Sequence, residues 1–356
     1  MTKKVFVDPN DIDKAIIQGI AKVVLDGGII ALPTETVYGL AAIAKNNEVV
    51  QRLYQIKRRP KDKPFTYVED EIDDVINSYF STLTPFGYRL IEKFWPGPLT
   101  IVYYSKKDEK IGVRIPSHPV AFEVIKAINQ QVFLPSANIS GEKEATQAEE
   151  VESIFLDKID LIVASDPSLV KGKPSTVIDL TYKPFKILRE GIISEKEIID
   201  VFIKKRIVFV CKGNTCRSPM AQFLFSKYLA EAKPYFKDRY QVLSRGVLPF
   251  GGIRLTKAVE DILKEKEHIV VDYFQSKPID RQTLLSSDLI FVMEDSQQEY
   301  LMSLEPTIEG RIFHLKKFLP PSLEKDIPDP IGKSYEFYEE VYKIIKKAIL
   351  ELVDWL

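Results

Sequence analysis

The stretch VFVCKGNTCRSPMA, residues 208–221, contains both cysteines of the 356-residue chain. It opens with a β-branched and aromatic apolar run, which is typical of a buried strand. Ser218 and Pro219 are residue types that begin helices, as the N-cap and the first helical position. The segment between must turn from a strand into a helix, so its peptide N–H groups can line an anion-binding nest beside the helix N-terminus.

The residues of this turn are suited to a bound phosphoryl group. Arg217 carries a planar, permanently charged fork that matches phosphate oxygens. Gly213 and Asn214 tolerate the left-handed backbone that a tight cradle requires. In such a field the thiol of Cys211 should ionise easily and act as a nucleophile in phosphoryl transfer. We expect Ser218 to donate a hydrogen bond to the thiolate, and a carboxylic acid on another loop to protonate the leaving group.

Other interpretations of the two cysteines remain open. A metal site needs about four ligands, and the three histidines, His118, His268 and His314, form no spaced cluster, so no protein motif predicts a metal. No motif supplies the histidine of a Cys–His protease pair. Two buried structural cysteines, or phosphate recognition without chemistry, are further alternatives. The nucleophile is favoured because strand, cysteine, five residues, arginine, serine and helix occur in that order.

Length, charge and composition predict a cytoplasmic protein with about two domains. The net charge of −1 gives no global attraction to nucleic acid or to anionic membranes. Two cysteines in 356 residues fit a reducing cytosol. The N-terminus lacks the pattern of a signal peptide, and no apolar run approaches the ~20 residues of a membrane helix. We therefore expect no membrane partner.

The domain boundary is predicted where the charge cluster 204–206 meets the β-branched run 207–210. This divides the chain into domains 1–200 and 205–356, both of the α/β class. The second domain alternates strands with helical stretches and ends in a long amphipathic helix from Tyr335 onward. Such alternation predicts a parallel sheet covered by helices on both sides.

The second domain resembles the low-molecular-weight protein tyrosine phosphatase family. Members carry Cys, five residues, Arg and Ser or Thr on a strand–loop–helix, with an Asp-Pro acid loop near the C-terminus. The segment DIPDPIGKSYEFY, residues 326–338, matches that acid loop, and LSRGV (243–247) and DLIFVMEDSQQ (288–298) also look like family segments. The resemblance covers about 150 residues and implies a doubly wound parallel sheet, phosphorylated protein substrates and no cofactor.

The resemblance also implies site roles. Cys211 is the expected nucleophile, Asp329 the general acid, and Arg217 and Ser218 their partners. A disulfide between Cys211 and the neighbouring thiol of Cys216 would protect the nucleophile under oxidation. The rest of the phosphate loop comprises Lys212, Gly213, Asn214, Thr215 and Cys216.

Two details look like the protein-arginine phosphatase branch of that family. Thr215 stands where tyrosine-directed members commonly carry a bulkier aliphatic residue, and a polar Thr leaves room for a guanidinium-derived group. The acid loop reads Asp-Pro-Ile-Gly, without the tyrosine pair of tyrosine-directed members. The family's arsenate reductases use further cysteines downstream, and none follows Cys216. An ordinary tyrosine phosphatase and a silent phosphoprotein-binding module remain alternatives.

In the first domain, small hydroxyls and basic residues recur near strand ends. Each alone is typical of a turn or a solvated surface, but together they suit a polyphosphate ligand. The chain has no Walker loop and no Gly-x-Gly-x-x-Gly, so a common nucleotide fold is not predicted. The candidate ligand-binding residues are Thr34, Tyr38, Lys57, Arg59, Arg114, Ser136, Asn138, Ser175 and Arg189.

Residues 8 to about 200 resemble the YrdC-like family of threonylcarbamoyl-AMP synthases. The shared motifs are PTETVYGL (33–40), the Lys-x-Arg of Lys57 and Arg59, and the Ser-x-Asn of Ser136 and Asn138. The resemblance implies a twisted open α/β sheet around a large positive cavity. It also implies formation of threonylcarbamoyl-AMP from ATP, L-threonine and bicarbonate with release of pyrophosphate, aided by Mg²⁺. The product serves tRNA modification, so tRNA or tRNA-modification proteins are possible partners.

Within that chemistry, Lys57, Arg59 and Arg189 are expected to neutralise phosphate charge. Thr34 and Tyr38 would hold threonine, while the Ser-x-Asn motif and Ser175 would bind ribose or phosphate oxygens; no general base stands out. One departure is FTYVED (65–70), where many synthases have Leu and then His; this is similar to a sister group of less clear function, although that group generally lacks a match to SANISG (136–141). An RNA-binding module without adenylyl transfer is the alternative.

Overall fold

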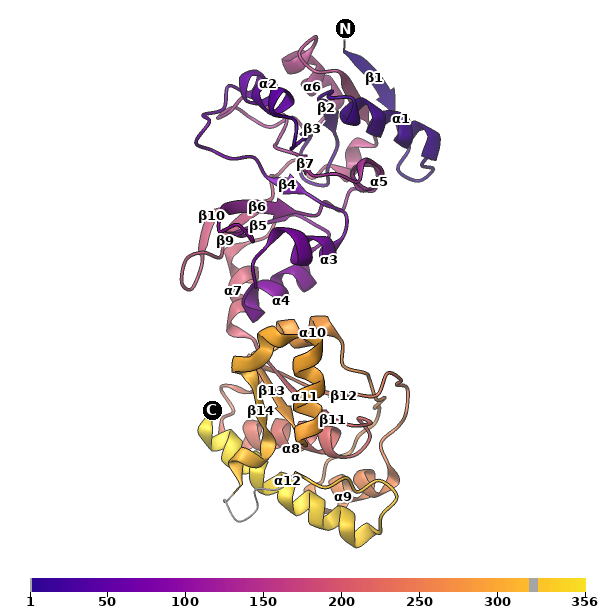
Figure 1. Ribbon diagram of the computed structural model, residues 1–356, viewed down its shortest axis with the longest axis vertical. Helices are drawn as coiled ribbons and strands as arrows, with labels where there is room; N and C mark the ends of the chain where they lie inside the picture. The colour runs from indigo at the N-terminus through magenta and orange to yellow at the C-terminus, as the bar shows by residue number, and fades with distance from the viewer. Residues whose placement is uncertain (1, 320–325) are drawn as a thin grey trace. The chain divides into compact units, whose positions relative to one another are not determined.

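The computed structural model describes residues 2–319 and 326–356 and divides the chain into two compact units (Figure 1). The first comprises Met1–Leu83 and Arg89–Ile199, and the second Thr84–Tyr88 and Asp200–Leu356. The division passes through two helices, α4 (Pro85–Phe94) and α7 (Glu195–Ile203). Within the described ranges, no helix has the length and apolar character needed to cross a membrane.

A ten-stranded mixed sheet organises the first unit, in the order β1-β8-β2-β3-β7-β4-β6-β5-β9-β10. Its strands are β1 (Lys3–Phe6), β2 (Ile30–Leu32), β3 (Gly39–Ile43), β4 (Tyr67–Val68), β5 (Leu99–Tyr104), β6 (Lys110–Arg114), β7 (Val132–Phe133), β8 (Leu161–Ala164), β9 (Thr176–Asp179) and β10 (Lys186–Arg189). Its other helices and helical turns are α1 (Lys14–Leu25), α2 (Asn47–Lys57), α3 (Ile72–Asp74), η1 (Val75–Tyr79), α5 (Pro119–Ile128), α6 (Ala148–Phe155) and η2 (Pro167–Leu169).

The core of the first unit lies on both faces of this sheet. Ile30 and Leu32 of β2 pack in one apolar cluster with residues of α1 and α5, whereas Ala31 packs in another with residues of α2 and α6. This alternation follows from the two-residue period of a strand. At the end of α2, Arg58 adopts a left-handed φ of 49°, which ends the helix and redirects the chain at Arg59.

A four-stranded, all-parallel sheet organises the second unit, in the order β12-β11-β13-β14. Its strands are β11 (Lys205–Cys211), β12 (Tyr240–Gly246), β13 (Leu289–Val292) and β14 (Ile312–His314). Its helices and helical turns are α8 (Arg217–Ala232), η3 (Lys237–Arg239), α9 (Lys257–Glu267), α10 (Arg281–Ser286), α11 (Asp295–Leu304), η4 (Pro306–Arg311), η5 (Leu315–Phe318) and α12 (Tyr335–Trp355).

Helices cover both faces of the parallel sheet, as the sequence predicts. Ile207 and Phe209 of β11 pack in a cluster with residues of α8, α9 and α12. Val208 and Val210, which point the other way, pack in a cluster with residues of α10 and α11. The doubly wound fold of the second unit and the α/β sheet of the first are therefore confirmed. β11 and β13 are the two central strands of the second sheet. The candidate phosphate site lies at their carboxyl ends.

Candidate active sites

The phosphate loop connects β11 to α8 in the second unit. Cys211 is the last residue of the strand and is 2% exposed. Asn214 has a left-handed φ of 53°, and its backbone N–H donates to the Cys211 Sγ at 3.3 Å. The loop packs tightly on Gly246, where a Cβ would lie 3.0 Å from the carbonyl oxygen of Lys212. The backbone therefore forms the predicted cradle around the thiol, and glycine at position 246 leaves room for it.

Ser218 lies within hydrogen-bonding distance of the thiol, as predicted. Its Oγ is 3.0 Å from Cys211 Sγ and 3.2 Å from the carbonyl oxygen of Arg245. It also accepts a hydrogen bond from Asn214 Nδ2 at 3.0 Å. The single hydroxyl proton of Ser218 can go either to the Arg245 carbonyl or to a thiolate at Cys211, and the thiolate, as the charged acceptor, forms the stronger hydrogen bond.

One local prediction about this loop is wrong. The helix begins at Arg217 with Cys216 as N-cap, not at Pro219 with Ser218 as N-cap. Ser218 turns its hydroxyl toward Cys211 instead of capping, and Pro219 falls in the first helical turn, where a missing N–H removes no intrahelical bond. Left-handed backbone is found at Asn214 but not at Gly213, whose φ lies outside that region.

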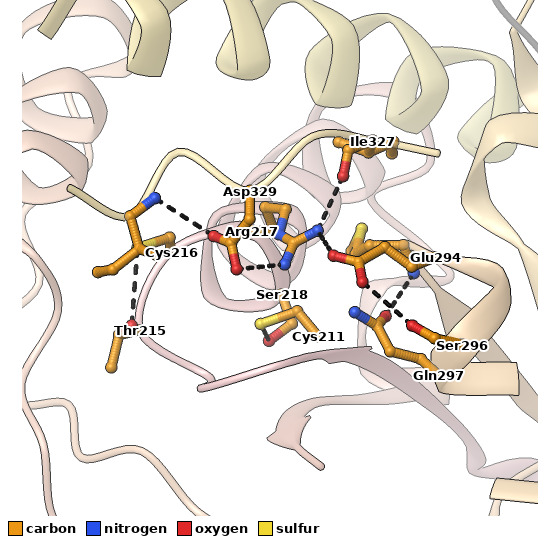
Figure 2. Close-up of polar contacts among 12 residues, drawn as sticks. Cys211, Thr215, Cys216, Arg217, Ser218, Glu294, Ser296, Gln297, Ile327 and Asp329 are labelled. Atoms are coloured by element: carbon orange, nitrogen blue, oxygen red, sulfur yellow. Dashed lines mark hydrogen bonds and ion pairs between the residues drawn. The ribbon is translucent and has the colours of Figure 1, made fainter. Parts of the chain in front are cut away.

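The guanidinium of Arg217 connects the phosphate loop to two carboxylates (Figure 2). The side chain is 1% exposed, and its Nη2 lies 2.7 Å from Asp329 Oδ2. Its Nη1 pairs with the carboxylate of Glu294 and donates to the carbonyl oxygen of Ile327 at 2.8 Å. Figure 2 shows Cys211 and Ser218 beside the same guanidinium. The structure thus brings together the four predicted catalytic residues.

Glu294 is a member of this site that the sequence did not single out. It is the N-cap residue of α11, two positions after β13 ends, and Ser296 donates a hydrogen bond to its second oxygen at 3.2 Å. Its place in the family-like segment 288–298 was the available signal. With Glu294 and Asp329 both on Arg217, an incoming phosphoryl anion must compete with carboxylates for the guanidinium.

The second thiol of the loop sits in a different environment. Cys216 Sγ lies 3.6 Å from Thr215 Oγ1, 3.5 Å from Thr256 Oγ1 and 3.8 Å from the Tyr338 hydroxyl. Burial raises the pKa of the Cys216 thiol, which keeps it protonated. Both cysteines are free. Thr215 is half-buried.

A cavity of about 600 Å³ opens in the first unit, which is within the ordinary size range of small-molecule sites. Seven of the nine predicted ligand-binding residues line it: Thr34, Tyr38, Arg59, Arg114, Ser136, Ser175 and Arg189. Polar lining residues that the prediction left out are Thr36, Asp62, Lys63, Thr66, Thr100 and Lys110. Five cations against one carboxylate make the described wall of this cavity strongly positive, which suits a polyanion.

Lys57 and Asn138 are not among the residues that line this cavity. Lys57 is 1% exposed, and its Nζ donates to the carbonyl oxygens of Ser136 at 2.5 Å and Asn138 at 2.8 Å, and approaches Asn138 Oδ1 at 3.2 Å. Burial, with a smaller contribution from Arg59, lowers the pKa of Lys57 to about 7. All three ammonium donors are thus directed to the Ser-x-Asn loop, so Lys57 orients that loop instead of facing the predicted phosphate.

Arg114 belongs to a buried chain of polar contacts behind the cavity wall. Its Nη2 pairs with Glu35 Oε1 at 2.5 Å, and its Nη1 donates to Thr36 Oγ1 at 3.0 Å. Glu35 Oε2 also accepts from the backbone N–H of Ser117 at 3.1 Å, and the hydroxyls of Thr36 and Thr34 lie 2.8 Å apart. Glu35 and Thr36 therefore fix Thr34 at the wall. Both residues belong to the PTETVYGL motif (33–40), and this is the sequence feature from which their role could have been predicted.

Two further arginines are held at the wall by short contacts. Arg189 Nη2 donates to Ser175 Oγ at 3.1 Å, and that oxygen lies 3.0 Å from Thr100 Oγ1. Arg59 Nε donates to the carbonyl oxygen of Lys63 at 2.9 Å. These contacts order the cations before a ligand arrives, which reduces the entropy lost on binding.

Comparison with known proteins gives the two halves of the chain separate families. The family model described as "Telomere recombination" (Sua5_yciO_yrdC) matches residues 22–191. The family model described as "Low molecular weight phosphotyrosine protein phosphatase" matches residues 206–356.

Individual relatives match the first half. A threonylcarbamoyl-AMP synthase of Pyrococcus abyssi is 33% identical over 206 residues, covering 54% of this chain and 60% of that protein. A putative threonylcarbamoyl-AMP synthase of Methanocaldococcus jannaschii is 31% identical over 188 residues, covering 51% of this chain and 87% of that protein. The chain thus spans 60% of the length of the Pyrococcus relative. In fold, a crystal structure of P. abyssi Sua5 complexed with L-threonine aligns with a TM-score of 0.53 at 24% identity, over 88% of this chain and 99% of that one.

Proposed function

The chain belongs to the Sua5/YciO/YrdC family over residues 22–191 and to the low-molecular-weight phosphatase family over residues 206–356, and from this premise we propose a bifunctional cytoplasmic enzyme. Its domains are 1–200 and 205–356. The first forms L-threonylcarbamoyladenylate from ATP, L-threonine and bicarbonate for tRNA modification. The second removes phosphate from protein side chains. The observation that carries the proposal is that each unit brings its own predicted site residues together: seven line the cavity of the first, and Cys211, Arg217, Ser218 and Asp329 meet in the second.

In the first domain, the amine of threonine and bicarbonate give a carbamate with loss of water. A carbamate oxygen then attacks the α-phosphorus of ATP, and the bond to the β-phosphate oxygen breaks to release pyrophosphate. Arg59, Lys63 and Arg189 stand at the wall to neutralise the charge that builds on this leaving group. Thr34 and Tyr38 are left to hold threonine, and the hydroxyls of Ser136 and Ser175 to bind ribose or phosphate oxygens.

The cavity residues fit a magnesium ion that arrives with the triphosphate. Among the described lining residues, Asp62 is the one carboxylate, and the other oxygen side chains are hydroxyls. Mg²⁺ typically keeps several waters and takes one or two carboxylates plus substrate phosphates. Asp62 would hold the ion, which would neutralise phosphate charge.

Threonine-dependent release of pyrophosphate tests the first activity. Purified full-length protein is given ATP, Mg²⁺ and bicarbonate, with or without L-threonine. We expect release only with threonine present, together with a threonylcarbamoyl adenylate visible by mass spectrometry. D-Threonine is the matched control for the substrate. Release at background level under all conditions would instead favour an RNA-binding module without adenylyl transfer.

In the second domain, the Cys211 thiolate attacks the phosphorus of the substrate, and the bond from phosphorus to the leaving atom breaks. Asp329 donates the proton that this atom needs, and Arg217 holds the phosphoryl oxygens. Water, deprotonated by Asp329, then attacks the phosphocysteine, and inorganic phosphate leaves as the thiolate is restored. The ion pair between Arg217 and Asp329 supports this arrangement, because it holds the proposed general acid next to the residue that would bind the phosphoryl group.

We further propose phosphoarginine as the preferred substrate. The partial exposure of Thr215 in the phosphate loop supports this, since a threonine hydroxyl can bond a guanidinium nitrogen. The residues after Asp329-Pro330 are Ile331 and Gly332, which provide no aromatic wall for a phosphotyrosine ring.

A direct comparison of substrates tests the preference. Equal amounts of phosphoarginine and phosphotyrosine peptides of the same sequence are given to the full-length protein, with Cys211→Ser as the blank. We expect faster phosphate release from phosphoarginine. Faster release from phosphotyrosine would make the domain an ordinary tyrosine phosphatase.

A further inference from the structure

The loop that carries Asp329 is fastened to the start of α11 by a small charged cluster. Asp326 Oδ1 accepts hydrogen bonds from the backbone N–H of Asp295 at 3.2 Å and from Lys316 Nζ at 3.1 Å. Lys316 Nζ also pairs with Asp295 Oδ1 at 3.0 Å, and His314 Nε2 lies 3.2 Å from that same oxygen. Asp326 thus joins two segments that flank β13 and β14.

The ammonium group of Lys316 lies within this cluster, between the carboxylates of Asp295 and Asp326. Asp295, His314 and Asp326 offer ligand atoms within 4.8 Å of one another, a grouping that resembles a metal site. However, the ammonium of Lys316 pairs with both carboxylates, and its side chain is only 18% exposed. A metal ion would have to displace this charge. The cluster is therefore a clamp made of protein groups.

The next residue, Ile327, also attaches the acid loop to the rest of the unit. Ile327 is 1% exposed, its backbone N–H donates to the carbonyl oxygen of Met293 at 3.0 Å, and its own carbonyl accepts from Arg217. Beyond Asp329, Pro330 is buried and residues 331–334 are exposed. Ile331 N–H donates to Asp329 Oδ1 at 3.3 Å, and Ser334 caps α12, its Oγ accepting from the backbone N–H of Phe337 at 3.4 Å. The polar contacts that join the loop to α11 and η5 thus come from its N-terminal side, whereas its C-terminal side continues into α12.

We propose that Asp326 is a positioning residue for the general acid. By holding Lys316 and the first N–H of α11, it sets the path of the loop and so the place of the Asp329 carboxyl above the phosphoryl site. This inference rests on the proposed phosphatase activity. Surface ion pairs contribute little to stability, so the clamp is expected to affect where the acid lies more than whether the domain folds.

The test uses two aryl phosphates and the full-length protein. The leaving group of phenyl phosphate needs a proton, whereas that of 2,4-dinitrophenyl phosphate departs without one. For Asp326→Ala we expect kcat/KM on phenyl phosphate to fall about tenfold, because this ratio reports transfer to Cys211, the step in which the leaving group takes its proton, and misplacing a catalytic group by a fraction of an ångström is costly. On dinitrophenyl phosphate we expect kcat/KM to fall by less than about twofold. The conservative Asp326→Asn keeps an acceptor oxygen and should restore most of the rate.

Matched variants separate positioning from folding. Lys316→Met removes the partner of Asp326 and should show the same dependence on the leaving group. Lys317→Met, at the exposed neighbouring position, should not. The thermal midpoint should stay within about 2 °C in all of them. Adding Asp326→Ala to Asp329→Asn should cost nothing further on phenyl phosphate, because the acid is already gone.

The outcomes distinguish this inference from the activity on which it rests. If Cys211→Ser still turned over either aryl phosphate, the proposed phosphatase mechanism would fail. If Asp329→Asn lost both substrates equally, its role as general acid would fail. If Asp329→Asn behaved as expected but Asp326→Ala and Lys316→Met slowed both substrates alike, or neither, the positioning role would be overturned.

Discussion

Replacing Cys211 with serine is expected to lower phosphate release about 10³-fold or more, while threonine-dependent pyrophosphate release stays at the wild-type rate. A serine hydroxyl fills nearly the same space and still faces the N–H of Asn214 and the hydroxyl of Ser218. It does not ionise near neutral pH, so the nucleophile is lost without disturbing the loop. The first unit keeps its rate because none of its described cavity-lining residues belongs to the second unit.

Both activities should be measured on one preparation of the full-length protein. Cys216→Ser is the matched control, since that thiol is buried, is held protonated by its surroundings and lies outside the proposed chemistry. We expect it to keep most of the phosphatase rate. Loss of pyrophosphate release in Cys211→Ser would show that the two sites depend on each other. Phosphate release that persisted in Cys211→Ser would remove the nucleophile from the mechanism.

Sequence patterns predict the individual helices and strands of this protein, because these depend on residues that are close together in the sequence. The apolar run before Cys211 and the periodicity after Tyr335 correctly predict β11 and α12, because strand and helix periods are properties of short segments. The prediction began α8 at Pro219 with Ser218 as N-cap, whereas the helix begins at Arg217, because a capping residue type can serve a site instead of a helix end. The strand order of the ten-stranded sheet was beyond prediction, since Lys3 in β1 pairs with Leu161 in β8.

Site residues divide in the same way. Motifs revealed groups that line the cavity, such as Arg59 and Ser136, because their residue types suit a polyanion. They did not reveal how Lys57 is used, since its acceptors at Ser136 and Asn138 lie about eighty positions along the chain. Asp326 looked like part of the acid-loop motif, and only the position of Lys316 showed what it holds.

Replacing Glu267 with alanine is expected to destabilise the second unit by about 3 kcal/mol. Glu267 ends α9 and is 1% exposed. Its carboxylate accepts from Lys227 Nζ and the Tyr228 hydroxyl, each at 2.7 Å. It also accepts from Lys346 Nζ at 2.7 Å and from the hydroxyl of Tyr342. Its loss leaves two ammonium groups and two hydroxyls without their shared partner, between α8, α9 and α12.

The same carboxylate gives the second unit a pH dependence of known sign. Burial works to raise the pKa of Glu267, but the hydrogen bonds from Lys227, Lys346 and Tyr342 together outweigh it and bring the pKa to about 2. An unfolded glutamate titrates near 4.3. The stabilisation is therefore complete above about pH 4.3 and is lost as the pH falls toward 2. The lysine side chains are 26% and 34% exposed, so solvent screening reduces the expected loss to about 2 kcal/mol.

Urea unfolding, followed by hydrogen exchange of the amides in α8 and α12, measures both effects in the full-length protein. Glu267→Ala should lower the unfolding midpoint of these helices at pH 7 and should show a weaker loss of stability below pH 4.3 than the wild type. Glu265→Ala, an exposed glutamate on the same helix, is the matched control and should change neither. An equal shift in both variants would mean that the glutamate content of the helix sets its stability and the buried carboxylate of Glu267 does not.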